Sequence, residues 1–552
     1  MLTFEEKPKF LESYSVRGFE VRQTIGEVGS LSVTLHPSKG MPDSELAAHA
    51  ELQEFFGQEF TCRVEDWKFT GTVEALEFDS ESGFRLILRD AMSRLAQTHT
   101  SQVFVDQSLS DVLGTLIPSG VPHECLAGCD SYMINLAIQY QESNLDFLKR
   151  LLHGIGGQIW CSAGKIFVAT GLTALQSQQG ESFSPVLRLR KEITDYTIRT
   201  ELGPEKVTVE THPYVENNNA QSTDVELEKA PFGFGKVQDS LIDIRKKNQG
   251  DESFHVIHED AGYDARKRWG EHFLRAHAHG RFLVQGTLRT PVPVGSEVQI
   301  AVLDPADGSG KDLETAFIRS INGYHDYRAD ESSWQFEAAN LEGLYPEKEW
   351  PDRRLIASAA TVVDTSENDP LKYNRVKVEF AWDKLRSVTP WLRVATPSWG
   401  EEHALYIPPE LDDIVLVLWG QVDMDPVVIG SVPAGFEVED NAASFFFKTV
   451  QGQTLTIGEN NIKFKNEVDG GGSTMEILPD KIVIGTGDGS GGTIEIQDDK
   501  IVITTANGQT VSLEQGKVKI DSAEGSDIEI KTAEIAQTAT KIALKASQID
   551  AG

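Results

Sequence analysis

Between Leu455 and Gly552 a short pattern of apolar and polar residues recurs six times. Each copy reads apolar, polar, apolar, and a third apolar residue follows the second by five positions. The copies begin at Leu455, Met475, Ile494, Val511, Ile528 and Ile542, in steps of 20, 19, 17, 17 and 14 residues. Self-similarity at a period of this size is typical of a stacked repeat rather than of a globular core.

The chemistry of each copy is that of strands and turns. Alternation of Ile and Val with Glu, Lys and Thr gives a strand one apolar and one polar face. Residues that tolerate tight or left-handed backbone predict turns between the strands. These turn positions are Asn460–Asn461, Pro479–Asp480, Asp498–Asp499, Asn507–Gly508 and Gln515–Gly516.

The apolar stripe of each copy is too thin to fill the interior of a single-chain solenoid. The segment contains no Trp, and Phe464 is its only Phe. We therefore predict an intertwined β-helix, most simply a homotrimer, in which the apolar faces of several chains meet on one axis and neighbouring chains close the strand edges. An ordinary β-sandwich tail is the alternative, and the regular spacing argues against it.

The residues predicted to form the trimer core of this needle are the recurring apolar ones. They are Leu455, Ile457, Ile462, Ile477, Ile482, Ile496, Ile501, Leu513, Val518, Ile530, Ile535, Leu544 and Ile549.

The length of 552 residues predicts about three or four domains. With 51 Lys and Arg against 85 Asp and Glu, the formal net charge is −34, which opposes binding to nucleic acid and to anionic membranes. Residues 1–6 contain no basic segment followed by an apolar run, so we expect no secretory signal and synthesis in the bacterial cytoplasm. No apolar run approaches the length of a membrane-spanning helix.

Four cysteines, Cys62, Cys125, Cys129 and Cys161, are too few to staple a chain of this length and suit a reducing cytoplasm. The pair at 125 and 129 lacks a second pair at zinc-finger spacing. We therefore predict unpaired thiols rather than a metal site.

Four histidines, His255, His258, His277 and His279, form a His-x-x-His and a His-x-His. They could bind a metal if the fold brought them together. The alternative, scattered imidazoles on and near a helix around residues 261–278, needs no such coincidence. We predict no metal and no cofactor.

The rest of the chain reads as mainly β. Alternating residues predict strands at 19–23, 31–35, 60–64, 68–73 and 84–88. Helical patterns follow at 109–117 and 144–152, the second capped by Ser143 or Asn144 and stopped at Gly156–Gly157, before a strand at 158–161. A second β-rich region extends from about 190 to 350. Short strands at 376–380, 391–394, 414–419 and 427–430 then predict a small closed barrel such as an OB-fold.

Several collinear segments resemble the VgrG spike family of contractile injection systems. One is the run Asn374–Asp383, which reads NRVKVEFAWD, and another is Gln139–Leu152, which reads QYQESNLDFLKRLL. The others are Trp391–Ala395, Ile407–Pro409 with Asp412–Val417, and Asp425–Ser431.

The resemblance implies a fusion of a phage baseplate hub with a central spike. Residues 1–350 would form the hub region, with two β-barrel tube-like domains and an α/β insert. Residues 355–432 would form the OB domain, 433–454 a linker, and 455–552 the trimeric β-helix spike.

The implied function is a homotrimeric spike that adapts a hexameric tube to a threefold needle, punctures target envelopes and carries effectors. The implied partners are an Hcp-like tube protein, baseplate proteins, effectors and a PAAR-repeat tip protein. The tip protein would contact Ile549, Asp550, Ala551 and Gly552, where small residues leave the last apolar layer exposed. The particle would finally be expelled toward a target cell or the extracellular space.

We predict no enzymatic activity, because the chain has no room for a lysozyme between Ser431 and Leu455 and stops without an effector domain. The alternative is a trimeric β-helical polysaccharide-degrading tailspike, which needs paired carboxylates in a groove. Its candidates, Asp480, Asp498 and Asp499, fall in predicted turns. A baseplate adaptor that never leaves the cell stays open, as does the choice among type VI, extracellular and phage-like systems.

Overall fold

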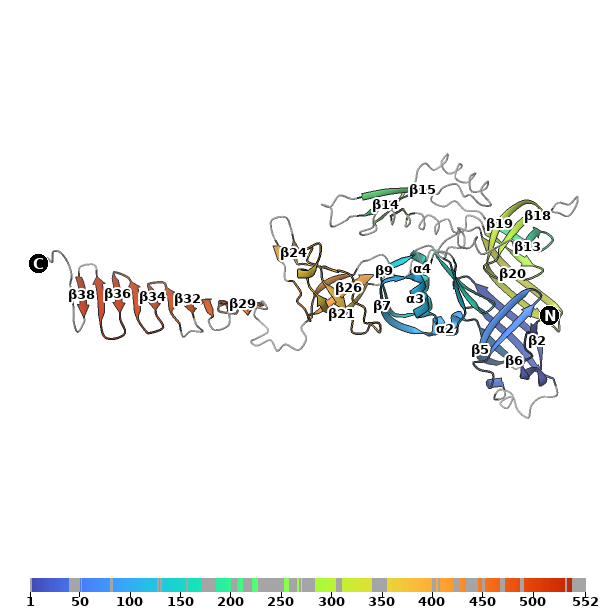
Figure 1. The fold of residues 1–552 in the computed structure, drawn as a ribbon, viewed down its shortest axis with the longest axis horizontal. Helices are drawn as coiled ribbons and strands as arrows, with labels where there is room; N and C mark the ends of the chain where they lie inside the picture. The colour runs from blue at the N-terminus through green and yellow to red at the C-terminus, as the bar shows by residue number, and fades with distance from the viewer. Residues whose placement is uncertain are drawn as a thin grey trace. The chain divides into compact units, whose positions relative to one another are not determined.

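The computed structural model describes two compact units, Met1–Pro433 and Ala434–Gly552 (Figure 1). The described residues are mainly β with a few helices, as predicted. Among them, no helix is long and apolar enough to cross a membrane. They are 2–38, 50, 52–79, 83–126, 129, 132–154, 157–169, 185–199, 206–211, 221–226, 253–257, 266–267, 270, 283–303, 310–339, 355–399, 404–405, 408–420, 426–432, 445–448, 452–466, 472–486, 491–531 and 534–538.

The hub region is built on a twelve-stranded sheet in the order β1-β4-β5-β6-β3-β2-β19-β18-β12-β13-β17-β20. Strand β20 also pairs with β19, so the six strands from β19 to β20 close into a barrel. The bounds are β1 Thr3–Phe4, β2 Tyr14–Thr24, β3 Ser30–Pro37, β4 Glu59–Val64, β5 Trp67–Asp79, β6 Gly83–Arg89, β12 Val186–Leu189, β13 Ile193–Arg199, β17 Leu283–Leu288, β18 Glu297–Leu303, β19 Gly310–Asp326 and β20 Glu331–Ala339; a 3-10 helix, η1, spans Lys9–Glu12.

One core runs through both halves of this sheet. The rings of Trp67 and Trp334, from opposite halves, lie 5.5 Å apart at their centroids, and both side chains are buried. Gly323 lets Trp334 approach, because a Cβ there would meet the indole at 2.3 Å. The pairing of β2 with β19 therefore joins the two halves into one packed body.

An α/β insert follows the first strands. Its helices are α2 Met92–Gln97, α3 Leu109–Leu116 and α4 Asn144–Gly154, the last two at the predicted positions. Its strands are β7 His99–Ser108, β8 His123–Cys125, β9 Met133–Ser143, β10 Gln158–Ser162 and β11 Lys165–Ala169. A separate small sheet contains β14 Lys206–Thr211, β15 Gln221–Glu226 and β16 Ser253–Ile257.

The structure decides between the two cap candidates of α4. The Ser143 hydroxyl accepts a hydrogen bond from the backbone N–H of Asp146 at 3.0 Å, so Ser143 is the N-cap. The buried Asn144 instead donates to the Leu116 carbonyl at 2.9 Å and accepts from Gln139 at 2.9 Å. Asn144 thus ties the start of α4 to the end of α3.

The prediction of an OB-fold domain is confirmed, and its domain bounds stay a prediction. Five strands form a sheet in the order β22-β21-β26-β27-β23. An isolated bridge between Val376 and Leu392 links the ends of this order, as a closed barrel requires. The bounds are β21 Leu355–Asp364, β22 Lys377–Glu379, β23 Arg393–Val394, β26 Ile414–Gly420 and β27 Val427–Ser431, with a 3-10 helix η3 at Ser366–Asn368 and a hairpin of β24 Ser398–Trp399 and β25 Ala404–Leu405.

The second unit contains one antiparallel sheet of eleven strands, in which each strand pairs with the next in sequence (Figure 1). We call it the C-terminal sheet. Its strands are β28 Phe445–Lys448, β29 Gln453–Ile457, β30 Ile462–Asn466, β31 Ser473–Ile477, β32 Lys481–Thr486, β33 Thr493–Gln497, β34 Lys500–Thr504, β35 Thr510–Glu514, β36 Lys517–Asp521, β37 Asp527–Lys531 and β38 Glu534–Thr538.

This meander differs from the intertwined β-helix that the repeat predicted. Within each described copy the second and third apolar residues are cross-strand partners, as in Ile457 with Ile462 and Ile496 with Ile501. The spacing of five positions therefore encodes a hairpin, because its turn folds the chain straight back on itself. The inner strands find both neighbours within one chain and do not need other chains to close their edges.

The cysteine prediction is wrong for one pair. Cys125 and Cys129 form a disulfide, with Cα atoms 6.1 Å apart, within the usual range for such a bond. Cys62 and Cys161 are free and buried, and burial raises the pKa of the Cys62 thiol to about 12. Burial in apolar surroundings makes these two thiols unreactive.

Candidate functional site

The C-terminal sheet has one predominantly apolar face, which we call the apolar face. Its first row follows the ladder of cross-strand partners Ile457, Ile462, Ile477, Ile482, Ile496, Ile501, Leu513, Val518, Ile530 and Ile535. A second row lies two positions away along each strand, and so on the same face: Leu455, Phe464, Met475, Ile484, Ile494, Ile503, Val511, Ile520 and Ile528.

The apolar face is open in the single chain. Ten of its large side chains are between 36% and 45% exposed: Ile457, Phe464, Ile484, Ile494, Ile496, Ile503, Leu513, Ile520, Ile528 and Ile530. An apolar surface of this extent marks an interaction site.

The structure brings together on this face every residue of the predicted trimer core that it describes. Their role in a trimer stays a prediction. Leu544, Ile549, Asp550, Ala551 and Gly552 lie outside the described residues. The site prediction omitted most of the second row, although in the first four copies the residue two positions after the third apolar residue is a large apolar one: Phe464, Ile484, Ile503 and Ile520.

The opposite face of the sheet is charged. Lys481 pairs with Glu495 at 3.0 Å, Lys500 with Glu514 at 3.3 Å, and Lys517 with Glu529 at 2.6 Å. The hydrogen bond from Lys517, followed by that from Lys531, lowers the pKa of Glu529. Since these ion pairs are solvated, each adds little stability. Their main effect is to keep this face of the sheet hydrated.

A second candidate site is the contact between the hub region and the OB domain. The carboxylate of Asp383, which is 2% exposed, accepts a hydrogen bond from the backbone N–H of Val103 on β7 at 3.0 Å. It also accepts from the N–H groups of Leu385 at 3.0 Å and Ser387 at 2.7 Å. The Ser387 hydroxyl donates to the Val103 carbonyl at 2.8 Å. Both backbone groups of Val103 are therefore held by the OB domain.

Aromatic side chains pack beside these hydrogen bonds. The ring of Tyr140, on β9, lies 5.0 Å from Trp382 and 5.8 Å from Trp419, both edge to face. Val103 and Ile138 belong to the same buried cluster as the OB barrel interior. The OB domain and the hub insert thus share one core. A mechanical force applied to one of them is therefore transmitted to the other through packed side chains.

This contact gives a structural reason for the two segments that carried the family resemblance. Tyr140 comes from the segment 139–152, and Trp382 and Asp383 end the run 374–383. Within the segment 139–152, Glu142 forms an ion pair with Arg150 at 2.5 Å, and Arg150 also donates to the Ile138 carbonyl at 2.8 Å. The two segments are complementary halves of one interface.

Asp369 organises a neighbouring OB loop. Its carboxylate, 2% exposed, receives two hydrogen bonds from the Arg375 guanidinium, at 2.6 and 3.1 Å. Backbone N–H groups of Leu371 and Tyr373 donate to it at 3.1 and 2.8 Å. Burial by itself would raise the pKa of Asp369, but these hydrogen bonds outweigh burial and lower the pKa to about 2.

We expect Asp369 to make OB-domain stability dependent on pH. Its folded pKa of about 2 lies below the ordinary value of 3.8, so its contribution is present above pH 4 and is lost as the pH falls toward 2. The shift corresponds to about 2 kcal/mol. Denaturant unfolding followed by tryptophan fluorescence should give Asp369→Asn a lower free energy of unfolding than the native chain at pH 7. This difference in unfolding free energy should shrink as the pH falls toward 2.5. A difference that does not change with pH would contradict this account.

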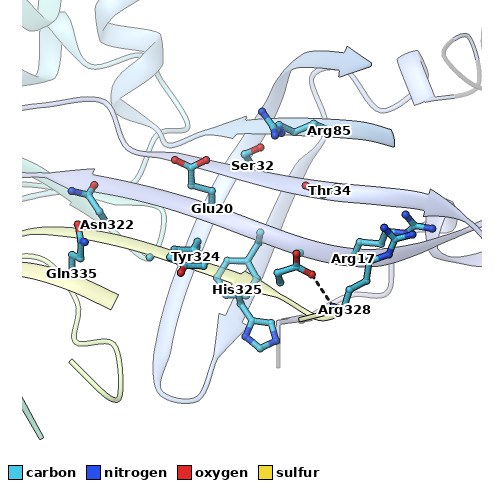
Figure 2. Close-up of a pocket in the computed structure, with 14 residues that line it drawn as sticks. Arg17, Glu20, Ser32, Thr34, Arg85, Asn322, Tyr324, His325, Arg328 and Gln335 are labelled. Carbon is cyan, nitrogen blue, oxygen red and sulfur yellow. Dashed lines mark hydrogen bonds between the residues drawn. The ribbon is translucent and has the colours of Figure 1, made fainter. Parts of the chain in front are cut away.

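Figure 2 shows a polar groove of about 510 Å³ where β2, β3 and β6 meet β19 and β20. Its walls include Arg17, Arg85 and Arg328. Burial, and then the like charge of Arg328, lower the pKa of Arg17. The marked hydrogen bond runs from the backbone N–H of Arg328 to the Asp326 carboxylate at 2.8 Å and belongs to a turn. The groove is a polar seam at the junction of the two halves of the large sheet.

In the part of the chain that the structure describes, no group of three His, Cys, Asp or Glu side chains is placed to hold a metal ion. Of the four histidines singled out in the sequence, His258, His277 and His279 lie outside the described residues, and for His255 only the backbone, on β16, is described. Asp480, Asp498 and Asp499 lie in hairpin turns, as their residue types predicted.

Two family models match the chain. Residues 22–290 match the phage tail baseplate hub family (GPD), and residues 358–432 match the type VI secretion system/phage-baseplate injector OB domain. No curated protein matches the sequence directly.

Solved structures with a similar fold include two VgrG complexes and a type VI secretion component. The half-lidded Francisella PdpA–VgrG complex has a TM-score of 0.53 at 10% identity, covering 86% of this chain and 84% of that one. The lidless PdpA–VgrG complex has a TM-score of 0.52 at 11% identity, covering 86% and 94%. An E. coli type VI secretion component described as similar to the T4 tail proteins gp27 and gp5 has a TM-score of 0.47 at 13% identity, covering 78% and 100%.

A baseplate hub followed in one chain by an injector OB domain defines the class: a central hub and spike protein of a contractile apparatus. The chain combines these two domains, and the resemblance to the VgrG-type spike family of contractile injection systems noted in the sequence is confirmed.

Proposed function

We propose that three copies of this chain assemble into the central spike of a contractile injection apparatus, with three C-terminal sheets as the walls of a needle. The observation that carries the proposal is the apolar face, on which ten large side chains are at least 36% exposed while the other face is charged. Three such sheets packed face to face around one axis would bury every apolar row and leave the ion pairs in water.

The energy available from this packing is sufficient for a stable trimer. Burying the remaining exposed fraction of ten large apolar side chains contributes on the order of 10 kcal/mol per chain. This gain competes with the lost translational and rotational freedom of association, which is of similar size. Because a trimer gains the burial term three times but incurs the association cost only twice, a net stabilisation on the order of 10 kcal/mol remains.

The role that follows is mechanical. A hub that matches a hexameric tube and a threefold needle would concentrate the thrust of the tube on a narrow tip that punctures the target envelope. Sheets whose inner strands are paired on both edges resist unravelling under load. The hub–OB contact, through Asp383 and Tyr140, would carry that load between domains. No catalytic step is needed for this role, and we propose none.

We propose the partners that this role requires: an Hcp-like tube protein, baseplate proteins, a PAAR-repeat protein docked at Ile549–Gly552, and effectors. The similar Francisella structure is a complex of a VgrG with PdpA, which supports a spike that carries a further protein. We propose synthesis in the bacterial cytoplasm, assembly into the particle and expulsion with it. The polysaccharide-degrading alternative has no support, because its candidate carboxylates are turn residues.

The test is the mass of the purified full-length chain by light scattering on a sizing column. We expect 182.7 kDa, three times the chain mass of 60.9 kDa, and persistence of that mass in moderate denaturant. A stable, folded species of 60.9 kDa would refute the trimeric needle.

A further inference from the structure

The polar groove in Figure 2 has a surplus of positive charge in a strongly acidic chain. Its lining contains the guanidinium groups of Arg17, Arg85 and Arg328, against the carboxylates of Glu20 and Asp326. The chain as a whole carries a net charge of −34, so a cluster of three arginines runs contrary to its composition. The groove therefore attracts anions that the chain as a whole repels.

Both carboxylates of the groove already have partners. Glu20 forms an ion pair with Arg22 at 2.6 Å. Asp326 accepts hydrogen bonds from the backbone N–H groups of Arg328 at 2.8 Å and Ala329 at 3.4 Å, which fix the turn that follows β19. Neither carboxylate forms an ion pair with an arginine of the groove lining within the described residues.

Two of the three guanidinium groups have no counter-charge in contact. Arg85 lies 3.5 Å from the Glu77 carboxylate, but among the described residues the guanidinium groups of Arg17 and Arg328 form neither an ion pair nor a hydrogen bond. Figure 2 shows the side chains of Arg17 and Arg328 beside each other at one end of the groove. Burial, and next the positive charge of Arg328, lower the pKa of Arg17, and the attraction of Asp326 is weaker than either. An anion bound at this end would remove the repulsion between the two arginines.

The floor of the groove offers both donors and acceptors of hydrogen bonds. Ser32 and Thr34 contribute hydroxyl groups, and the cross-strand partners Asn322 and Gln335 contribute amides. Hydroxyl and amide groups can pair with the N–H and the C=O groups of an extended peptide, whereas phosphate oxygens only accept. The floor therefore suits a peptide better than the phosphate backbone of a nucleic acid.

We propose that this groove binds an extended segment of a partner protein that carries carboxylate side chains. The guanidinium groups of Arg17 and Arg328 would each bind a carboxylate through two parallel N–H donors. In an extended segment, alternate side chains lie on one side about 7 Å apart, so an acidic residue at every second position presents its carboxylates to the groove. This binding goes beyond the proposed mechanical role and needs no contact between copies of the chain.

The test measures the binding of short peptides to the full-length chain by fluorescence anisotropy. The probe is a fluorescein-labelled octapeptide of alternating Glu and Thr, and the matched peptide has Gln in place of each Glu. We expect the Glu peptide to bind roughly tenfold or more tightly than the Gln peptide, because charge-assisted hydrogen bonds are lost with the carboxylates. The affinity of the Glu peptide should fall at high ionic strength.

Two single variants locate the binding to the groove. Arg17→Gln and Arg328→Gln should each weaken the binding of the Glu peptide roughly tenfold. The side chain of Arg328 is exposed in a turn and has no partner among the described residues, so this variant is expected to fold normally. Arg63→Gln is the matched control, because Arg63 belongs to the same large sheet and pairs with Glu5 outside the groove lining. It removes the same charge and should leave the affinity unchanged.

Three results would overturn the inference. The first is equal affinity of the Glu and Gln peptides, and the second is equal weakening by Arg63→Gln and Arg17→Gln. The third is tighter binding of a labelled thymidine octanucleotide than of the Glu peptide, which would identify a phosphate backbone as the ligand. The light-scattering mass of the same samples tests the trimer separately. A monomer that binds the Glu peptide through Arg17 would refute the trimer and support this inference.

Discussion

Replacing Ile503 by lysine is expected to turn the trimer into monomers, whereas lysine at the adjacent Val502 should leave it intact. Ile503 lies in the second row of the apolar face, 42% exposed, between its cross-strand partners Ile494 and Val511. In the proposed needle, one lysine per chain would place three ammonium groups in an apolar interior. Each costs several kcal/mol to desolvate without a partner, so three together exceed the net stabilisation of the trimer, which is on the order of 10 kcal/mol.

Val502 provides a closely matched control. It lies on the same strand but on the charged face, where its cross-strand partners are Glu495 and Ser512. A lysine there gains a carboxylate neighbour and stays in water. Light scattering should give 60.9 kDa for Ile503→Lys and 182.7 kDa, three times that mass, for Val502→Lys. Equal masses for the two variants would show that the apolar face is not the contact between chains.

The second large effect is expected at Asp383. Alanine at this position removes the acceptor of three N–H groups, of which that of Val103 is 280 positions away in sequence. Leaving these groups buried and unsatisfied should cost about 3–5 kcal/mol. The loss should appear where the hub meets the OB domain, so amide hydrogen exchange in β7 around Val103 should become faster together with exchange in the OB barrel.

A turn aspartate of the same domain controls for nonspecific destabilisation. Asp413 accepts a hydrogen bond from the N–H of Glu410 at 2.9 Å, in an exposed turn without the hub contact of Asp383. Asp413→Ala should cost about 1 kcal/mol or less and leave exchange around Val103 unchanged. If Asp413→Ala accelerates exchange in β7 as much as Asp383→Ala does, the hydrogen bonds to the Val103 backbone do not couple the two domains.

The local sequence determined most of the elements. Period-2 alternation located strands such as β3 and β33, because a half-buried strand must place apolar side chains on one side. In the C-terminal sheet, the spacing of five residues between Ile496 and Ile501 even determined the register, since a hairpin pairs residues symmetrically about its turn. The first row of the apolar face could therefore be chosen from the sequence before any strand was placed.

What the repeat pattern left open was which strands pair. A hairpin and one coil of a multi-chain helix present the same alternation, and only the tertiary structure joined Ile462 to Ile477 within one chain. Likewise, both Ser143 and Asn144 have cap chemistry, and the nearby carbonyl of Leu116 decided between them.

Contacts between residues far apart in sequence could not be predicted from local patterns at all. The hydrogen bond from Val103 to Asp383 spans 280 positions, and the local sequence around either residue does not indicate its partner. Periodicity reports which face of a strand is apolar, because that depends only on neighbours along the chain. Which apolar face finds a partner depends on where folding brings the other surfaces. The tertiary structure therefore decided that the OB interior and the hub insert share a core, while among the described residues the apolar face stays exposed.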